Sequence, residues 1–243
     1  MFFELHADLP REGPGDDAST ERALRLLRGL PAEPRILDIG CGPGAQTLVL
    51  ARNTRGIVTA VDLHHPFLDE VMRRAGATGL AEHVRPLRAS MDALPCEPEL
   101  FDLVWSEGSI YIMGFERGLR AWQPFVRQGG YVVVSELSWL VDDPPALARA
   151  FWEDAYPAMR PVAESLSTVE RCGYERVADF VLPKSAWLDD YYAPLARRMD
   201  AFERDHANDP AALKFLAGER REIELFHAHG DTYGYVFYLM RRP

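Results

Sequence analysis

The sequence predicts an α/β fold: a doubly wound, seven-stranded sheet, mostly parallel with an antiparallel last strand, plus a helical cap. Two observations predict the layered part. Apolar runs that suit buried parallel strands alternate with helical segments, and the first run opens into a glycine-rich turn that leads into a helix. The third observation is a closing strand at 231–240 that follows a pair of helices instead of a crossover, which favours an antiparallel end.

Composition narrows the class of protein. The 243 residues, 47% hydrophobic and 26% charged, are typical of a globular α/β domain with a sizeable core. A net charge of -10 argues against a nucleic-acid partner, because such binding depends on clustered Lys and Arg. Cys41, Cys96 and Cys172 form neither a disulfide framework nor a metal pair, which fits a reducing cytoplasm. No apolar run approaches the roughly 20 residues that cross a bilayer, and no signal peptide is expected.

Residues 1–30 are expected to form an N-terminal helix or lid. The turn at 13–15 precedes a helix that runs to about Leu30 and that any of three polar residues can cap: Asp16, Asp17 or Ser19. Two interpretations stay open. The helix packs on the sheet edge, or the segment covers a ligand with the Gly-Pro-Gly turn near it.

The residues at 35–47 are the centre of the prediction. A buried strand ends in a turn with Gly40, Gly42 and Gly44, and a helix follows from Ala45. Glycines allow backbone to approach a ligand closely, and the helix N-terminus favours an anionic group. The spacing also fits the dinucleotide fingerprint, so an NAD-dependent oxidoreductase stays an alternative. Asp38 favours a cofactor with an ammonium and a sulfonium, since a pyrophosphate would be repelled by a carboxylate ahead of the loop.

The second strand, 57–62, ends in Asp62, roughly 20 residues past the glycines, a spacing that suits a carboxylate bound to ribose hydroxyls. The elements expected after it, in order, are a helix at 66–76, strands at 84–89 and 101–105, a helix at 115–126 with a C-cap at 128–130, a strand at 131–136, helices at 146–158 and 165–171, a strand at 177–182, and two helices within 186–229 broken near 208–210.

Asp38, Gly40, Gly42 and Gly44 match, position for position, the first motif of the class I S-adenosylmethionine (SAM)-dependent methyltransferases. The sequence resembles small-molecule members of the ubiquinone-biosynthesis type. A narrower bacterial subgroup is similar at 105–108, 114–118 and 233–238. The resemblance implies a Rossmann-like fold in a single domain over 1–243. Its expected parts are a lid at 1–30, a SAM-binding core at 31–140, cap helices with strand six at 141–230, and a last strand at 231–243.

The resemblance implies SAM as cofactor, S-adenosylhomocysteine as product, and no metal. Met91 and Asp92 correspond to the adenine contacts of the family. The implied cofactor-binding residues share the glycine loop and the ends of the following strands: Asp38, Gly40, Cys41, Gly42, Gly44, Gln46, Thr47, Asp62, Leu63, Ser90, Met91, Asp92, Ser106 and Glu107.

Three side chains at the carboxyl ends of strands four and five are candidate catalytic bases: Glu107, Tyr111 and Glu136. The predicted reaction is in-line displacement of the methyl group onto a small-molecule acceptor, by a monomer or homodimer in the cytoplasm. A non-catalytic SAM-binding module is a further alternative, because binding residues and turnover are separate matters.

Overall fold

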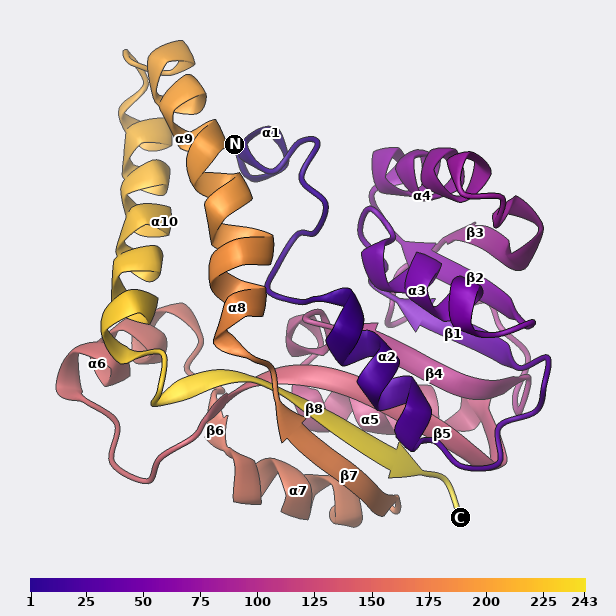
Figure 1. The fold of residues 1–243 in the computed structure, drawn as a ribbon. Helices are drawn as coiled ribbons and strands as arrows, with labels where there is room; N and C mark the ends of the chain where they lie inside the picture. The colour runs from indigo at the N-terminus through magenta and orange to yellow at the C-terminus, as the bar shows by residue number, and fades with distance from the viewer.

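The protein is described over residues 1–243 by a computed structural model (Figure 1). All of its strands belong to one sheet: β1 (Arg35–Ile39), β2 (Ile57–Asp62), β3 (Val84–Arg88), β4 (Phe101–Glu107), β5 (Val126–Trp139), β6 (Arg160–Pro161), β7 (Glu175–Val181) and β8 (Tyr233–Arg241). The strand order is β3-β2-β1-β4-β5-β8-β7, and the short β6 pairs with β5 outside this path.

The direction of the strands confirms the predicted sheet. Neighbouring strands from β3 to β5 are parallel, whereas β8 is antiparallel to both β5 and β7. The order of the strands reverses between β1 and β4, and ligands of doubly wound sheets bind beyond the carboxyl ends of the strands at such a point. The two-residue strand β6 is an addition that the sequence did not indicate.

Helices cover both faces of the sheet: α1 (Phe2–Leu5), α2 (Asp17–Leu26), α3 (Ala45–Asn53), α4 (His65–Ala77), α5 (Phe115–Trp122), α6 (Ala146–Ala155), α7 (Val162–Arg171), α8 (Lys184–Trp187), α9 (Ala193–Asp205) and α10 (Pro210–His229). Four short turns of helix complete the chain: η1 (Ala81–His83), η2 (Ile110–Ile112), η3 (Gln123–Phe125) and the π-helix η4 (Leu188–Tyr192). Apolar residues of α2, α3 and α4 pack in one core, and those of α5 and α7 in a second core.

Helix ends follow local chemistry. Asp16, one of the three predicted candidates, caps α2, since its carboxylate accepts the Ser19 N–H at 2.6 Å. That helix ends at Leu26 and not near Leu30, because Gly29 has φ +84° and Pro31 follows two residues later. Asp209 caps α10 in the same way as Asp16 caps α2, at the predicted break between the last two helices.

The predicted helix C-cap at 128–130 is wrong. Helix α5 ends at Trp122, because Pro124 lacks an N–H group, and β5 already begins at Val126. Gly129 and Gly130 lie inside that strand and pair with the chain end: the Gly129 N–H donates to the Arg242 carbonyl, and the Arg242 N–H donates to the Gly130 carbonyl. Pairing with a distant strand therefore overrides the local glycine signal.

The cap is a group of helices beside β7 and β8. Figure 1 shows α9 and α10 standing away from the sheet as a hairpin, with α1 beside α9. Helix α8, the π-helix η4 and α9 follow one another without a loop. None of the helices combines the length and the apolar character that a membrane span needs.

Candidate active site

A pocket of about 550 Å³ lies at the carboxyl ends of β1, β2 and β4, next to the reversal of strand order. Its walls come from the glycine turn, the end of β2, the loops after β3 and β4, the segment before α2, and one side chain of β8. The lining residues are Phe2, Phe3, Arg11, Glu12, Gly13, Pro14, Gly40, Cys41, Gly42, Pro43, Ala45, Gln46, Val61, Asp62, Leu63, His64, Phe67, Ala89, Ser90, Met91, Glu107, Gly108, Ser109, Tyr111, Ile112 and Tyr235.

The glycine turn has the backbone that the sequence predicts. Gly40 and Gly44 have φ +70° and +89°, where side chains are disfavoured. A Cβ on Gly40 would lie 2.4 Å from the Ser109 hydroxyl oxygen, and one on Gly44 would lie 2.6 Å from a Val71 methyl carbon. Gly42 lines the pocket, whereas Gly44 does not and is the N-cap of α3. The turn is therefore packed tightly against Ser109 and Val71, and its Gly42 side is open toward the pocket.

Asp38 lies beneath the turn and does not line the pocket. Its carboxylate is fully buried and accepts hydrogen bonds from the Thr47 hydroxyl at 2.5 Å and from the Gln46 amide at 3.3 Å. The Gln46 amide also donates to the Cys41 carbonyl at 3.2 Å. Burial raises the pKa of Asp38 to about 7, partly offset by the Thr47 hydrogen bond. The acid thus joins the turn to the first turn of α3, and only Cys41 and Gln46 of this group face the pocket.

Asp62 lines the pocket at the end of β2, and both carboxylate oxygens accept backbone hydrogen bonds. One accepts the Gly42 N–H at 3.0 Å and the other accepts the His64 N–H at 2.8 Å. Leu63, the next residue along the chain, also lines the pocket, and 58% of its surface is exposed. Asp62 therefore fixes the pocket side of the glycine turn and still presents free lone pairs to a ligand.

The loop after β3 contributes part of the predicted adenine contacts. Ser90 and Met91 line the pocket, and the Met91 carbonyl accepts the Trp122 indole N–H at 2.9 Å. Asp92 is exposed and lies outside the lining, where it accepts the Ser90 hydroxyl at 2.5 Å, a bond that lowers its pKa. Met91 is thus held in place by α5, while Asp92 and Ser90 form a small local turn.

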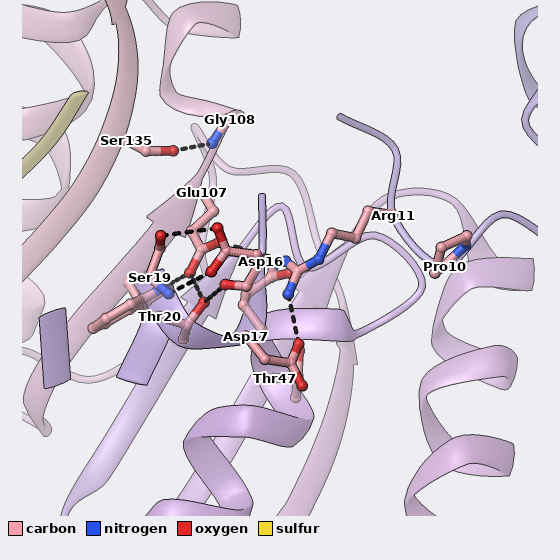
Figure 2. Close-up of polar contacts among 12 residues, drawn as sticks. Pro10, Arg11, Asp16, Asp17, Ser19, Thr20, Thr47, Glu107, Gly108 and Ser135 are labelled. Carbon is pink, nitrogen blue, oxygen red and sulfur yellow. Dashed lines mark hydrogen bonds and ion pairs between the residues drawn. The ribbon is translucent and has the colours of Figure 1, made fainter. Parts of the chain in front are cut away.

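Glu107 lies at the end of β4 and connects the sheet to the N-terminal segment, which we define as residues 1–15. One carboxylate oxygen accepts hydrogen bonds from the Thr20 hydroxyl at 2.7 Å and the Trp105 indole at 2.9 Å. The other lies 3.6 Å from the Arg11 guanidinium, which also donates to Asp17 at 2.8 Å (Figure 2). Burial raises the pKa of Glu107, and Arg11 opposes the shift. Both oxygens are engaged, as expected for a structural anchor.

Tyr111 and Glu136 lie close together, but only Tyr111 lines the pocket. Its side chain is 45% exposed on η2, and its ring is 5.8 Å from that of Tyr156. The Tyr156 hydroxyl donates to one oxygen of the buried Glu136, whose second oxygen has no hydrogen-bond partner. Burial raises the pKa of Glu136 to about 7. Ser106 is also buried behind the pocket, where its hydroxyl lies 2.7 Å from that of Ser109.

Sequence reasoning missed much of the wall that the N-terminal segment provides. The lid interpretation placed only the turn at 13–15 near a ligand, and Gly13 and Pro14 do line the pocket. Phe2, Phe3, Arg11 and Glu12 line it as well, and the Phe3 ring stacks on His64 at 4.0 Å. The paired phenylalanines at the chain start were the available signal. Tyr235 of β8 gave none, because its closeness to Gly108 depends on the sheet.

Comparisons with known proteins agree with this geometry. A family described as a methyltransferase domain matches residues 36–130, which include the glycine turn, Asp62 and Glu107. A malonyl-[acyl-carrier protein] O-methyltransferase of Salmonella typhimurium is 34% identical over 56% of this chain, and that match spans about half of the relative's length (49%). The 27-O-demethylrifamycin SV methyltransferase of Amycolatopsis mediterranei is 26% identical over 94% of this chain and 85% of its own length.

A solved structure shows the same fold over the whole chain. The crystal structure of a SAM-dependent methyltransferase from Geobacter sulfurreducens, in complex with S-adenosyl-L-homocysteine, aligns with 100% of this chain and 97% of its own. The TM-score is 0.84 at 20% sequence identity. The architecture therefore extends beyond the matched residues 36–130 and includes the cap.

Proposed function

We propose that this protein, whose residues 36–130 match a methyltransferase domain and whose fold is Rossmann-like, is a SAM-dependent methyltransferase that acts on a small molecule. The observation that carries the proposal is the pocket at the strand reversal, where the glycine turn and Asp62 lie in the same wall.

The residues present fit the cofactor. Gly42 lines the pocket and has no side chain, so a ligand can approach its backbone, and a Glu12 side-chain carbon lies 3.5 Å from the position of a Cβ there. Asp62 would accept hydrogen bonds from ribose hydroxyls, and Met91 with Leu63 would contact the adenine ring. When bound, SAM supplies a methyl group on a positively charged sulfur. The acids of this pocket suit that charge.

The main task of the chain is to hold an acceptor in line with the methyl group and to exclude water, which can be worth effective molarities of about 10⁵–10⁸ M. Tyr111, Ile112 and Tyr235 line the part of the pocket next to Gly108, and we assign the acceptor to this part. Of the candidate bases, Glu107 and Tyr111 line the pocket. Burial raises the pKa of Tyr111, so its neutral hydroxyl suits a role as a proton relay. Glu136 acts behind it, and Glu107 anchors the N-terminal segment.

The proposal extends to the setting of the reaction. A small acceptor suits a pocket of about 550 Å³ whose lining combines aromatic and aliphatic side chains with polar ones. All three cysteines are free, as in a protein that works in a reducing cytoplasm. We propose a single catalytic domain with its lid and cap, acting as a monomer or homodimer without nucleic acid.

Calorimetry with S-adenosylhomocysteine and with NAD tests the cofactor, and a methyl-transfer assay against a panel of amines, alcohols, thiols and activated carbons tests the reaction. Binding of S-adenosylhomocysteine without NAD binding is expected, together with transfer to at least one acceptor. NAD binding alone would contradict the proposal. Cofactor binding without transfer to any acceptor would favour a non-catalytic binding module.

A further inference from the structure

Glu12 is an acid of the N-terminal segment that lines the cofactor pocket, outside the family match at 36–130. Its Cγ lies 3.5 Å from the position of a Cβ on Gly42, so the side chain lies over the glycine turn. Asp62, which accepts the Gly42 N–H, is the charged group with the largest effect on Glu12. Two acids therefore face the same part of the pocket from different elements.

One oxygen of Glu12, Oε2, is buried and has no hydrogen-bond partner. A buried carboxylate oxygen without a partner is costly, and such atoms in folded proteins usually have a role. No basic side chain of the protein donates a hydrogen bond to this oxygen. Arg11 donates to Asp17 and lies beside Glu107, while Arg74 donates to Glu70 and to the carbonyls of residues 9 and 10. The charge of Glu12 therefore has no basic partner within the protein, and the residue lines the ligand pocket.

Neighbouring contacts hold Glu12 in this place. On one side, the Arg74 guanidinium of α4 donates to the Leu9 and Pro10 carbonyls at 3.1 Å and 2.9 Å. On the other side, Arg11 is fixed by Asp17 and Glu107 (Figure 2). Because the chain is anchored immediately before Glu12 by both contacts, the acid is positioned before any ligand binds.

We propose that Glu12 contacts the cofactor and makes the site bind the cationic methyl donor more tightly than the uncharged-sulfur product. This inference rests on the proposed function. Methyl transfer removes the positive charge of the sulfur, so the product loses an attraction that the donor has. An additional carboxylate at the pocket selects for the donor and helps the product to leave.

The ionisation of Glu12 agrees with this role. Burial, then the charge of Asp62, raises its pKa to about 7, and Arg74 opposes the shift. The other charged or titratable groups at the pocket are Asp38 beneath the glycine turn and, in the lining, Arg11, Cys41, Asp62, His64, Glu107, Tyr111 and Tyr235. A cation bound nearby stabilises the ionised form of Glu12, so binding of the donor should release a proton from this residue. Donor affinity should rise between about pH 6 and about pH 8, and product affinity should rise less.

The test compares Glu12→Gln with Glu33→Gln, an exposed acid outside the pocket that loses the same charge. Calorimetry measures SAM and S-adenosylhomocysteine affinities at about pH 6, 7 and 8, in two buffers of different ionisation enthalpy to count protons. Thermal unfolding confirms that both variants fold. Near pH 8, Glu12→Gln should weaken SAM binding about tenfold, because the glutamine amide carries no charge that attracts the sulfonium.

Under the proposal, the same variant weakens S-adenosylhomocysteine less than about threefold and loses the proton release, while Glu33→Gln matches the wild-type protein in every measurement. Equal loss for both ligands, or no loss for either, would overturn the inference and leave the proposed function intact. Failure of the wild-type protein to bind either ligand would instead overturn the proposed function.

Discussion

Replacement of Asp62 by alanine tests the cofactor wall most specifically. The substitution removes the acceptors of two backbone hydrogen bonds, those of Gly42 at 3.0 Å and His64 at 2.8 Å, and the carboxylate assigned to the ribose. Loss of the two backbone hydrogen bonds changes the shape of the glycine turn, whereas loss of the carboxylate removes a direct contact with the ligand. Both are expected to weaken cofactor binding.

The magnitude follows from the number of charged hydrogen bonds. Each is worth about 1.5–3 kcal/mol, and about 1.4 kcal/mol corresponds to a factor of ten in Kd. Loss of one bond to the ligand therefore weakens S-adenosylhomocysteine by at least about tenfold. The two orphaned N–H groups lie at the pocket and can bind water, so the cost in stability should be only about 1–2 kcal/mol, or roughly 2–8 °C in Tm.

Calorimetry with S-adenosylhomocysteine gives the affinity, and thermal unfolding gives the stability. Asp62→Asn serves as a matched variant, since its amide keeps one acceptor oxygen but presents an N–H donor to either Gly42 or His64. It should fall between alanine and wild type in affinity. A Kd for Asp62→Ala within twofold of wild type, in a folded protein, would refute the assignment of this acid to the ligand.

Three further predictions concern the turn, the N-terminal segment and the buried acid. Gly40→Ala should lower Tm by several degrees, because its Cβ would lie 2.4 Å from a hydroxyl oxygen at φ +70°, whereas Gly218→Ala in open space should not; similar shifts would contradict the tight fit. Glu107→Gln should speed proteolysis of the N-terminal segment, since it removes one of the two acids that hold Arg11, and an unchanged cleavage rate would count against the anchor. Burial raises the pKa of Asp38 to about 7, above its unfolded value of about 3.9, so the stabilisation by its protonated form is lost as pH rises toward 7. Urea unfolding should show wild type losing up to about 1.4 kcal/mol more per pH unit than Asp38→Asn between about pH 5 and 7, and parallel curves would contradict this.

The sheet was predictable because its strands are short apolar runs, and buried parallel strands leave that pattern locally. The closing strand was predicted as antiparallel and is so, in contact with β5 and β7. Errors arose where distant pairing decides the structure. Gly129 and Gly130 read as a helix end, yet they extend β5 because the chain end at Arg242 pairs with them.

The site divides in the same way. Gly40, Gly42 and Asp62 follow from spacing, and the structure brings them together in one wall. Asp38 and Glu136 were expected at the ligand, and the structure places both behind the pocket, where burial keeps them from the lining. That these two acids affect ligand binding stays a prediction.

The N-terminal contribution could not be deduced from local sequence. Glu12 belongs to a turn-forming stretch with no regular pattern, and its place over Gly42 depends on contacts from α4 and α2. Tyr235 likewise reaches the pocket only because β8 pairs with β5. Such residues are brought to the site by tertiary structure, which spacing along the chain does not encode.

A crystal structure grown with S-adenosylhomocysteine tests the central claim most directly. The account predicts the ligand in the pocket at the ends of β1 and β4, with its sugar at Asp62 and its chain over Gly40 and Gly42. A ligand bound elsewhere on the protein, or no binding by crystals or by calorimetry, would contradict it.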